Sequence, residues 1–354
     1  MSDILDTIIV GGGQSALACA YFFRRTNLTY LILDDNPEPG GAWLKAWDSL
    51  TLFSPPEFSN LPGYLMPKSQ HKYPTREEVI SYLKTYEERY KISVERPVHV
   101  MDVCFKNNLF EVKTNNQSYF ARTVISATGI LQKPYIPSYT GQEMFKGLQL
   151  HSSQYKNPQQ LKGKKVIVIG GGNSGAQVLA EVSKIAHAKW ITLREPSYLP
   201  DDVDGRVLFD LASAKYYALQ KGEPLSPEQY NLGSIVMMPS VLEARERGVL
   251  HTLRPFDRFY EQGVIWPDGS KEEIDAVIWC TGFGYALDHL QCLNLVKATG
   301  KIVTNGTRAT EQPGLWLVGY GGWTGFASAT LIGVGRSARE TVKEIQEYLQ
   351  ERGT

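Results

Sequence analysis

A glycine-rich turn near the start of the chain constrains the fold more than any other feature. An apolar run, residues 6–10, precedes Gly11, Gly13 and Ala16 in a GxGxxA pattern, and apolar residues at helical spacing follow. Such glycines let the backbone approach a pyrophosphate at a helix N-terminus, and the alanine permits close helix packing. A second predicted strand ends in Asp34, 21 positions after Gly13, where a carboxylate would accept hydrogen bonds from a ribose diol. We interpret this unit as a dinucleotide site; the alternative is a structural turn with a solvated Asp34.

The same pattern recurs in residues 165–194. The apolar run KVIVI precedes Gly170, Gly172 and Gly175, and a helical run and the strand-like WITL follow. The two units differ in what comes after them, so they do not form a solenoid repeat. Two fingerprints predict two bound dinucleotides.

The residues after each fingerprint indicate which dinucleotide it would bind. The first continues into PGGAW, residues 39–43, an extension that suits a flavin dinucleotide. The second ends in Arg194 and Glu195, where an acid would take a ribose diol and an arginine a 2′-phosphate. Further along the chain, each unit has another predicted strand that ends in a turn of small residues. This turn contains Gly129 in the first unit and Gly282 in the second. These turns either let the backbone pass beside a cofactor or are simply tight strand exits.

The order of elements predicts an α/β fold in which one domain interrupts another. A chain of 354 residues is long for one hydrophobic core. Its last segment is predicted to form a strand, a glycine-dense loop and a long helix. The N-terminus of this helix can point its dipole at a flavin, in which case the segment returns to the first domain. We expect two Rossmann-like domains: an FAD-binding domain of residues 1–157 and 287–354, and an inserted NAD(P)H-binding domain of residues 158–286.

Residues 196–259 exceed what a second Rossmann unit needs. Loops this long usually have a function. Our hypothesis is a helical insertion that covers the nicotinamide and substrate side, with Met237 and Met238 as adaptable apolar surface. The alternative is a helical excursion on the outside of the domain.

Composition excludes several classes of partner. Lys plus Arg equals Asp plus Glu at 37 each, so no overall field favours nucleic acid or an anionic membrane. The histidines lack metal-ligand spacing, and no apolar run approaches the roughly 18 residues of a membrane span. The N-terminus begins a strand at once, without a signal-type region, so we expect a cytoplasmic protein. The cysteines lack CxxC spacing, and we predict that all are buried thiols in a reducing compartment: Cys19, Cys104, Cys280 and Cys292.

A third motif identifies a family. The stretch FKGLQLHSSQYK lies between the two fingerprints and matches FxGxxxHxxxYK, with Phe145, Gly147, His151, Tyr155 and Lys156 in register. This sequence is the signature of the flavin-containing monooxygenases, and the three motifs in order resemble that family over the whole chain. Related Baeyer–Villiger monooxygenases usually carry Trp in place of the motif Tyr. The segments WDSLTLFSPPEFSNLPG and YPTREEVISYL look like the small bacterial members, including the group found in arsenic-resistance operons.

The resemblance implies an enzyme that uses FAD, NADPH or NADH, and O₂. Reduced flavin would form a C4a-(hydro)peroxide that oxygenates the sulfur or nitrogen of a small molecule, and Baeyer–Villiger oxidation of ketones stays open. The alternative is a flavoprotein reductase or oxidase that passes electrons to a partner or to oxygen; a redox sensor is a further rival. The resemblance to the family also implies a possible homodimer.

The resemblance also carries cofactor contacts onto this sequence. For the flavin they are Gly11, Gly13, Gln14, Ser15, Ala16, Asp34, Gly41, Trp43, Val100 at the adenine edge, and Gly129. For the nicotinamide nucleotide they are Gly170, Gly172, Asn173, Ser174, Gly175, Arg194, Glu195 and Gly282.

Several positions depart from the family pattern, and two of them concern the reaction and the nicotinamide nucleotide. Phe53 stands where larger members place an asparagine that faces flavin and nicotinamide, so it is our candidate catalytic position. Glu195 stands where relatives strict for NADPH have a hydroxyl residue, and its charge would repel a 2′-phosphate, so NADH should also be used. For the FxGxxxHxxxYK residues we favour a structural role in the linker over direct contact with the nicotinamide dinucleotide.

Overall fold

The computed structural model describes residues 4–222, 234–325 and 327–353. The chain divides into two compact units. The first comprises Met1–Leu44, Pro55–Lys133 and Gly284–Thr354, and the second comprises Lys45–Ser54 and Pro134–Phe283. Each unit contains a parallel sheet with helices, so the predicted α/β class with two Rossmann-like domains is confirmed.

The unit boundaries differ from the predicted ones. Residues 134–157 and 45–54 belong to the second unit rather than the first. The reason lies in strand pairing and side-chain bonding: Leu148–His151 forms a parallel ladder with Ala276–Trp279. In addition, the Lys156 ammonium donates hydrogen bonds to the carbonyls of Lys45 and Ala46.

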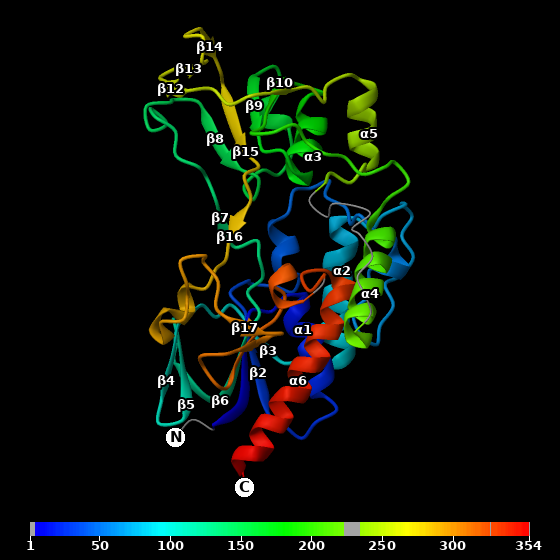
Figure 1. Cartoon of the computed structure of the whole chain (residues 1–354), viewed down its shortest axis with the longest axis vertical. Coiled ribbons are helices and arrows are strands. Elements are labelled where there is room, and N and C mark those ends of the chain that lie inside the picture. The colour runs from blue at the N-terminus through cyan, green and yellow to red at the C-terminus, as the bar shows by residue number, and fades with distance from the viewer. Residues whose placement is uncertain (1–3, 223–233, 326, 354) are drawn as a thin grey trace. The chain divides into compact units, whose positions relative to one another are not determined.

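The first unit is built on a sheet with a parallel centre. Strands run in the order β19-β6-β1-β2-β3, and an antiparallel hairpin, β4 and β5, branches from β6 (Figure 1). The strands are β1 (Leu5–Val10), β2 (Tyr30–Leu33), β3 (Val94–Glu95), β4 (Val100–Lys106), β5 (Leu109–Thr114), β6 (Ser118–Ser126), β17 (Thr304–Asn305), β18 (Arg308–Ala309) and β19 (Leu315–Leu317). The helices are α1 (Gln14–Phe23), α2 (Arg76–Tyr90), α6 (Leu331–Gly353) and the short 3₁₀ turns η2 (Pro56–Phe58), η4 (Asp288–Leu293) and η5 (Gly321–Thr324); η1 (Gly41–Lys45) ends at the boundary between the units.

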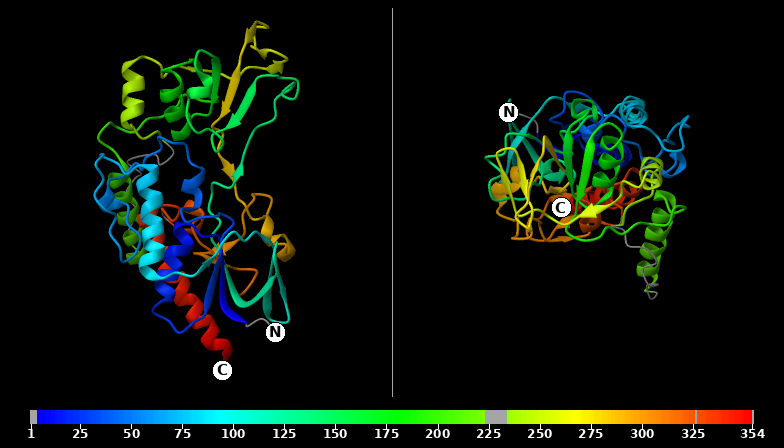
Figure 2. Two further views of the ribbon diagram at one scale, coloured as in Figure 1. Left: turned by 180° about the vertical axis from the view of Figure 1, so that it is seen from behind. Right: turned by 90° about the horizontal axis from the view of Figure 1, so that it is seen from above.

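Local sequence accounts for the helix ends in this unit. Helix α2 begins with a capping box, in which the Thr75 hydroxyl accepts a bond from the Glu78 amide and the Glu78 carboxylate accepts one from the Thr75 amide. It ends at Lys91, which adopts a left-handed conformation. Helix α6 packs alongside α1, which can be followed in the view from behind (Figure 2).

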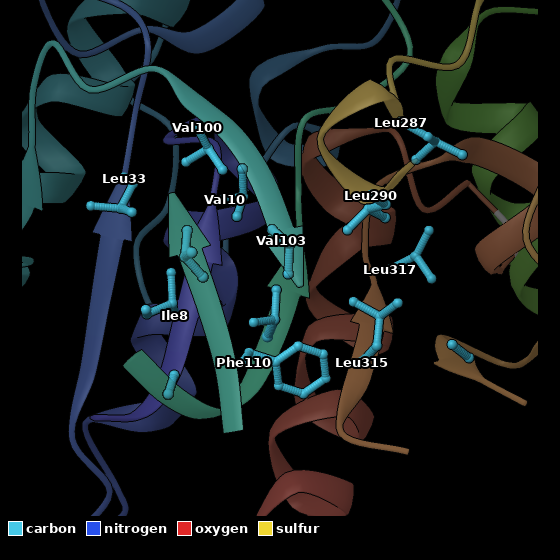
Figure 3. Packing of buried hydrophobic residues seen from close by; sticks show 14 of the residues in the cluster. Ile8, Val10, Leu33, Val100, Val103, Phe110, Leu287, Leu290, Leu315 and Leu317 are labelled. Atoms are coloured by element: carbon cyan, nitrogen blue, oxygen red, sulfur yellow. The ribbon is translucent and has the colours of Figure 1, made fainter. Parts of the chain in front are cut away.

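An apolar core fills the space between the parallel strands and the hairpin. Its side chains come from β1, β4, β5, β19 and η4, which explains why the C-terminal segment completes the first unit (Figure 3). Those labelled in the figure are Ile8, Val10, Leu33, Val100, Val103, Phe110, Leu287, Leu290, Leu315 and Leu317.

The second unit contains a five-stranded parallel sheet. Its order is β11-β10-β9-β15-β8, and a separate antiparallel sheet, β12-β13-β14, lies between β11 and β15 in the chain. The apolar runs KVIVI and AVIW lie at its centre, as expected for strands covered on both faces. The strands are β8 (Leu148–His151), β9 (Lys165–Ile169), β10 (His187–Ile191), β11 (Thr252–Leu253), β12 (Arg258–Tyr260), β13 (Gly263–Ile265), β14 (Lys271–Glu273) and β15 (Ala276–Trp279), and β7 (Lys133–Pro134) pairs with β16 (Phe283–Gly284). The helices are α3 (Asn173–Val182), α4 (Gly205–Lys221), α5 (Pro239–Glu246) and η3 (Gln159–Leu161).

The predicted insertion forms α4 and α5 and packs as part of the second unit. Met237 and Met238 are 5% and 4% exposed, so the prediction that they form an adaptable surface is wrong. They lie between two points at which the insertion is fastened to α3: the Val236 amide bonds to the Asn173 side chain, and α5 packs on α3. Residues 223–233 of the insertion lie outside the described part of the chain. In the described residues, no helix combines the length and apolar character needed to cross a bilayer.

The cysteine prediction is also wrong in part. Cys104 on β4 and Cys292 on η4 form a disulfide, with Cα atoms 5.3 Å apart, whereas Cys19 and Cys280 are buried thiols. The bonded residues are separated by 188 positions, and no spacing rule could have paired them. The argument for a reducing compartment from cysteine usage therefore fails.

We predict that two thiols, not four, react with a thiol reagent when the oxidised protein is unfolded without reductant. Cys292→Ser should also lower the free energy of unfolding by about 2–5 kcal/mol, because the cross-link restricts the unfolded chain. Four reactive thiols in freshly purified, unreduced protein would contradict the pairing.

Candidate functional sites in the two units

The first glycine fingerprint forms a turn between β1 and α1. Gly11 has a φ of +100°, and a Cβ there would lie 2.7 Å from the carbonyl oxygen of Ala127 at the exit of β6. Gly13 is the N-cap of α1, with no side-chain cap and no acidic residue in the first turn. The first amides of α1 thus lack a side-chain acceptor at the cap, which is the arrangement that holds a phosphate group.

Two further glycines border this turn. A Cβ at Gly41 would lie 2.7 Å from the Cα of Gly13, and Gly129, with a φ of +75°, has open space where its Cβ would be. The loop at Gly41 is held by Arg76, which donates hydrogen bonds to the carbonyls of Trp43 and Leu44, both at 3.0 Å. The sequence prediction missed Arg76, although it begins the well-marked helix α2.

Asp34 lies against the same turn and is held by an ion pair. Its Oδ2 accepts a 2.7 Å hydrogen bond from Arg96 Nε, and Arg96 also forms bonds of 2.7 and 2.9 Å with the Glu87 carboxylate. The side chains of Arg96 and Asp34 are 9% and 2% exposed. Burial opposes the charged guanidinium, but the bonds to Glu87 and Asp34 raise the pKa of Arg96 above its usual value. A Cβ on Gly12 would lie 2.4 Å from Asp34 Oδ2, so this carboxylate needs a glycine beside it.

The other predicted flavin residues contact protein groups. The side-chain amide of Gln14 donates a 2.6 Å hydrogen bond to the backbone carbonyl of Ala329, just before α6. Ser15 and Ala16 are buried, and a Cβ on Gly319 would lie 2.0 Å from Ser15 Oγ. Val100 packs into the core of the first unit, so its contact with an adenine stays a prediction.

The second fingerprint repeats the turn geometry. Gly170 has a φ of +132°, and a Cβ there would lie 2.1 Å from the carbonyl of Cys280 at the exit of β15. A Cβ on Gly175 would lie 2.0 Å from the Gly170 carbonyl, which also accepts a 2.8 Å bond from the Trp190 indole. Gly172 caps α3 without a side-chain bond.

The predicted residues around α3 fall into two groups. Gly172 and Gly282 have open space where a Cβ would be, and Gly282 has a φ of +82°. Asn173 instead accepts a 2.9 Å bond from the Val236 amide, and Ser174 is half-buried in the first turn. The open positions could admit a second dinucleotide, whereas Asn173 fastens the insertion.

Arg194 and Glu195 are exposed just beyond the end of β10. Glu195 Oε2 accepts bonds from Arg254 Nη2 at 2.8 Å and from the Thr252 hydroxyl at 3.0 Å. The bond from Arg254 lowers the pKa of Glu195 below its usual value. Arg254 was not predicted, because it lies 59 positions away and only strand pairing brings it here.

The first residues of the FxGxxxHxxxYK motif shape β8 and the exit of β15. Phe145 is buried against Phe259, with ring centroids 5.2 Å apart, and a Cβ on Gly147 would lie 2.1 Å from the Phe145 ring. His151 Nε2 lies 3.0 Å from the carbonyl oxygen of Gly282. Burial lowers the pKa of His151, which favours the neutral ring as the donor of this bond.

The last residues of the motif hold the segment 45–54 within the second unit. The fully buried Tyr155 donates a 2.8 Å bond to Glu181 Oε2 on α3, and the Ser49 hydroxyl bonds to the other oxygen of this carboxylate. Lys156 donates to the carbonyls of Lys45 and Ala46. These contacts give the motif a structural role within the second unit, and its role in holding the geometry of the two domains stays a prediction.

Phe53 also packs within the second unit. Its carbonyl accepts a 2.7 Å bond from the Gly205 amide, and its ring lies 5.7 Å from the Phe209 ring of α4. A Cβ on Gly205 would lie 2.6 Å from the Phe53 ring. The half-buried ring therefore rests on the start of α4, and its place beside a flavin stays a prediction.

We predict that Arg96→Met lowers the free energy of unfolding by about 3 kcal/mol, because the buried Asp34 and the partly buried Glu87 would both lose their cation. The matched control is Arg122→Met, which removes the more exposed pair with Asp6 and should cost less than about 1 kcal/mol. Denaturant unfolding measures both. Equal effects of the two substitutions would contradict the importance of the Asp34 pair.

A second prediction concerns Glu181. Burial raises the pKa of this carboxyl above its ordinary value of 4.5. Its contribution to stability is therefore complete below pH 4.5 and is lost as the pH rises through the higher folded value. Glu181→Gln should remove this loss, so the variant gains stability relative to the original chain as the pH rises above 4.5. Thermal unfolding at several pH values checks it, and a constant difference would contradict it.

Comparison with known proteins identifies the family of the chain. The family model described as pyridine nucleotide-disulphide oxidoreductase matches residues 8–202. The solved structure of a flavin-containing monooxygenase from Stenotrophomonas maltophilia is 48% identical, with a TM-score of 0.89, and the match covers 98% of this chain and 99% of that one.

Two curated relatives extend this picture. An uncharacterized oxidoreductase, CzcO, from Bacillus velezensis is 31% identical over 96% of this chain and 99% of its own length. The probable indole-3-pyruvate monooxygenase YUCCA1 of Arabidopsis thaliana is 24% identical over 96% of this chain and 89% of its own. The chain therefore belongs to the pyridine nucleotide-disulphide oxidoreductase family and, within it, to the flavin-containing monooxygenases, enzymes that depend on FAD and a pyridine nucleotide.

Proposed function

We propose that this enzyme uses NADH as well as NADPH to oxygenate soft nucleophiles, such as the sulfur or nitrogen of small molecules, with O₂. The observation that carries the proposal is the intact FxGxxxHxxxYK motif between two glycine turns whose helices begin without side-chain caps. Baeyer–Villiger oxidation of a ketone is the variant of this chemistry that the motif tyrosine disfavours.

The first unit has the groups that FAD requires. The turn at Gly11 and Gly13 and the free amides of α1 would hold the pyrophosphate. Asp34, fixed by Arg96, would accept hydrogen bonds from the ribose diol. The open Cβ position of Gly129 leaves space for the cofactor beside the exit of β6. When bound, the flavin supplies electron transfer from the nicotinamide and the reaction with oxygen.

The second unit offers the matching groups for NADH or NADPH. The turn at Gly170 and Gly172 and the amides of α3 would take the pyrophosphate. Glu195 would accept bonds from the ribose diol of NADH, and Arg194 would contact the 2′-phosphate of NADPH. Both groups are exposed at the same strand end, which supports the use of either nucleotide.

The cysteines argue against thiol–disulfide chemistry in this chain. Burial raises the pKa of Cys280 to about 12, and it also raises the pKa of Cys19. Neither thiol would ionise near pH 7, and reactive cysteines need the thiolate. The Cys104–Cys292 bond joins β4 to η4 and has no CxxC spacing. We infer oxygen transfer rather than disulfide reduction.

The protein side chains would then position groups and exclude water. His151 bonds to the Gly282 carbonyl, so no proton transfer is assigned to it. Phe53 cannot donate a hydrogen bond to a flavin or nicotinamide ring. We propose that it forms an apolar wall there, which would keep water from the reacting atoms.

The test is anaerobic reduction of the flavin-loaded enzyme with NADH and with NADPH, followed by mixing with oxygenated buffer in a stopped-flow spectrometer. We expect both nucleotides to reduce the flavin. An absorbance band of the C4a-(hydro)peroxide should then outlast reduction and decay faster when a thioether is added. Direct return to oxidised flavin with peroxide release, unaffected by a sulfide or ketone, would contradict oxygen transfer and favour a reductase or oxidase.

A further inference from the structure

Arg254 lies outside both glycine fingerprints. It contacts Glu195, the acid that we propose binds the ribose of the nicotinamide nucleotide. We propose that Arg254 determines which nicotinamide nucleotide the second unit accepts, by cancelling the charge of Glu195 so that a 2′-phosphate is tolerated there. This inference rests on the proposed use of NADH and NADPH.

Strand pairing places Arg254 at this position. It directly follows β11, which pairs in parallel with β10 so that Leu253 lies opposite Ile191. Arg254 therefore lies level with Thr192, and its Nη1 donates a 3.0 Å bond to the Thr192 hydroxyl and a 3.4 Å bond to the Thr192 carbonyl. The guanidinium is thus held by the end of the neighbouring strand. A cation fixed in this way loses little conformational entropy when a ligand arrives.

The two carboxylate oxygens of Glu195 differ in their hydrogen bonds. Both Arg254 and Thr252 donate to Oε2, at 2.8 and 3.0 Å. Oε1 keeps its lone pairs for a ribose hydroxyl, so the pairing with Arg254 does not remove the acceptor that NADH needs. The same carboxylate can therefore serve the diol while its charge is compensated.

The charges at this strand end decide how a phosphate is received. Arg194 and Arg254 are cationic and Glu195 is anionic, so these three groups carry one excess positive charge. Without Arg254 the sum is zero, and Glu195 would face the phosphate uncompensated. A dianionic 2′-phosphate would then meet repulsion as well as attraction, whereas a neutral ribose diol would not.

Two exposed leucines support a nucleotide at the same place. Leu193, just beyond β10, is 82% exposed, and Leu253 on β11 is 40% exposed. Large apolar side chains from neighbouring strand ends offer a surface for an adenine ring beside the charged groups.

The experiment measures the binding of 2′,5′-ADP and 5′-AMP to the flavin-loaded enzyme by calorimetry. The probes differ only in the 2′-phosphate, and bound FAD keeps them out of the first unit. Arg254→Gln should weaken 2′,5′-ADP about tenfold, as expected for a lost interaction with a charged group, and should change 5′-AMP less than about twofold. The ratio of KM for NADPH to KM for NADH should rise in parallel.

A double-substitution cycle tests the mechanism. Removing the acid as well, in Arg254→Gln/Glu195→Gln, should restore 2′,5′-ADP binding to within about threefold of the original chain if charge cancellation is the cause. Absence of this rescue would overturn the proposal. The matched control is Arg245→Gln, because Arg245 forms a similarly exposed pair with Asp201, at 2.9 and 2.6 Å, and should leave both probes unchanged.

The outcomes separate this inference from the proposed function. If the original enzyme binds neither probe and neither nicotinamide nucleotide reduces its flavin, the proposed function fails. If it binds 2′,5′-ADP but Arg254→Gln leaves the ratio of the two affinities unchanged, only the role of Arg254 fails.

Discussion

The close approach of a backbone carbonyl to a glycine is the constraint on which both units depend. At Gly11 and at Gly170, the space that a side chain would occupy is filled by the carbonyl of a neighbouring strand exit, Ala127 or Cys280. Each contact sets how closely the strand before the turn, β1 or β9, approaches its neighbour and where the following helix begins. The helices α1 and α3, whose N-termini have no side-chain cap, begin directly after these two turns.

Features encoded by local sequence could be predicted, and those created by long-range pairing could not. Both fingerprints, the α/β class and the acids at the strand ends follow from short patterns whose physical role is known. Arg96 and Arg254 lie 62 and 59 positions from the acids they hold, and Cys104 lies 188 positions from Cys292. No alternation or spacing marks such partners, because they meet only after the sheet has formed.

Other errors have a different cause. The long insertion predicts an adaptable apolar surface at Met237 and Met238, yet both side chains are buried, next to the bond between the Val236 amide and the Asn173 side chain. The position of the second fingerprint predicts a domain boundary at the connector before β9, whereas β8 already belongs to the second sheet. The FxGxxxHxxxYK motif explains this shift, because its phenylalanine, histidine, tyrosine and lysine all contact groups of the second unit.

The disulfide has a topological consequence. Cys104 and Cys292 lie in the first unit, one on each side of the long inserted segment Pro134–Phe283. The bond therefore closes a covalent ring that contains this whole segment. If a protease cut the backbone once anywhere between the two cysteines, the two fragments would remain one molecule until a reductant was added. Damage to the inserted unit would thus leave both parts of the first unit joined to each other.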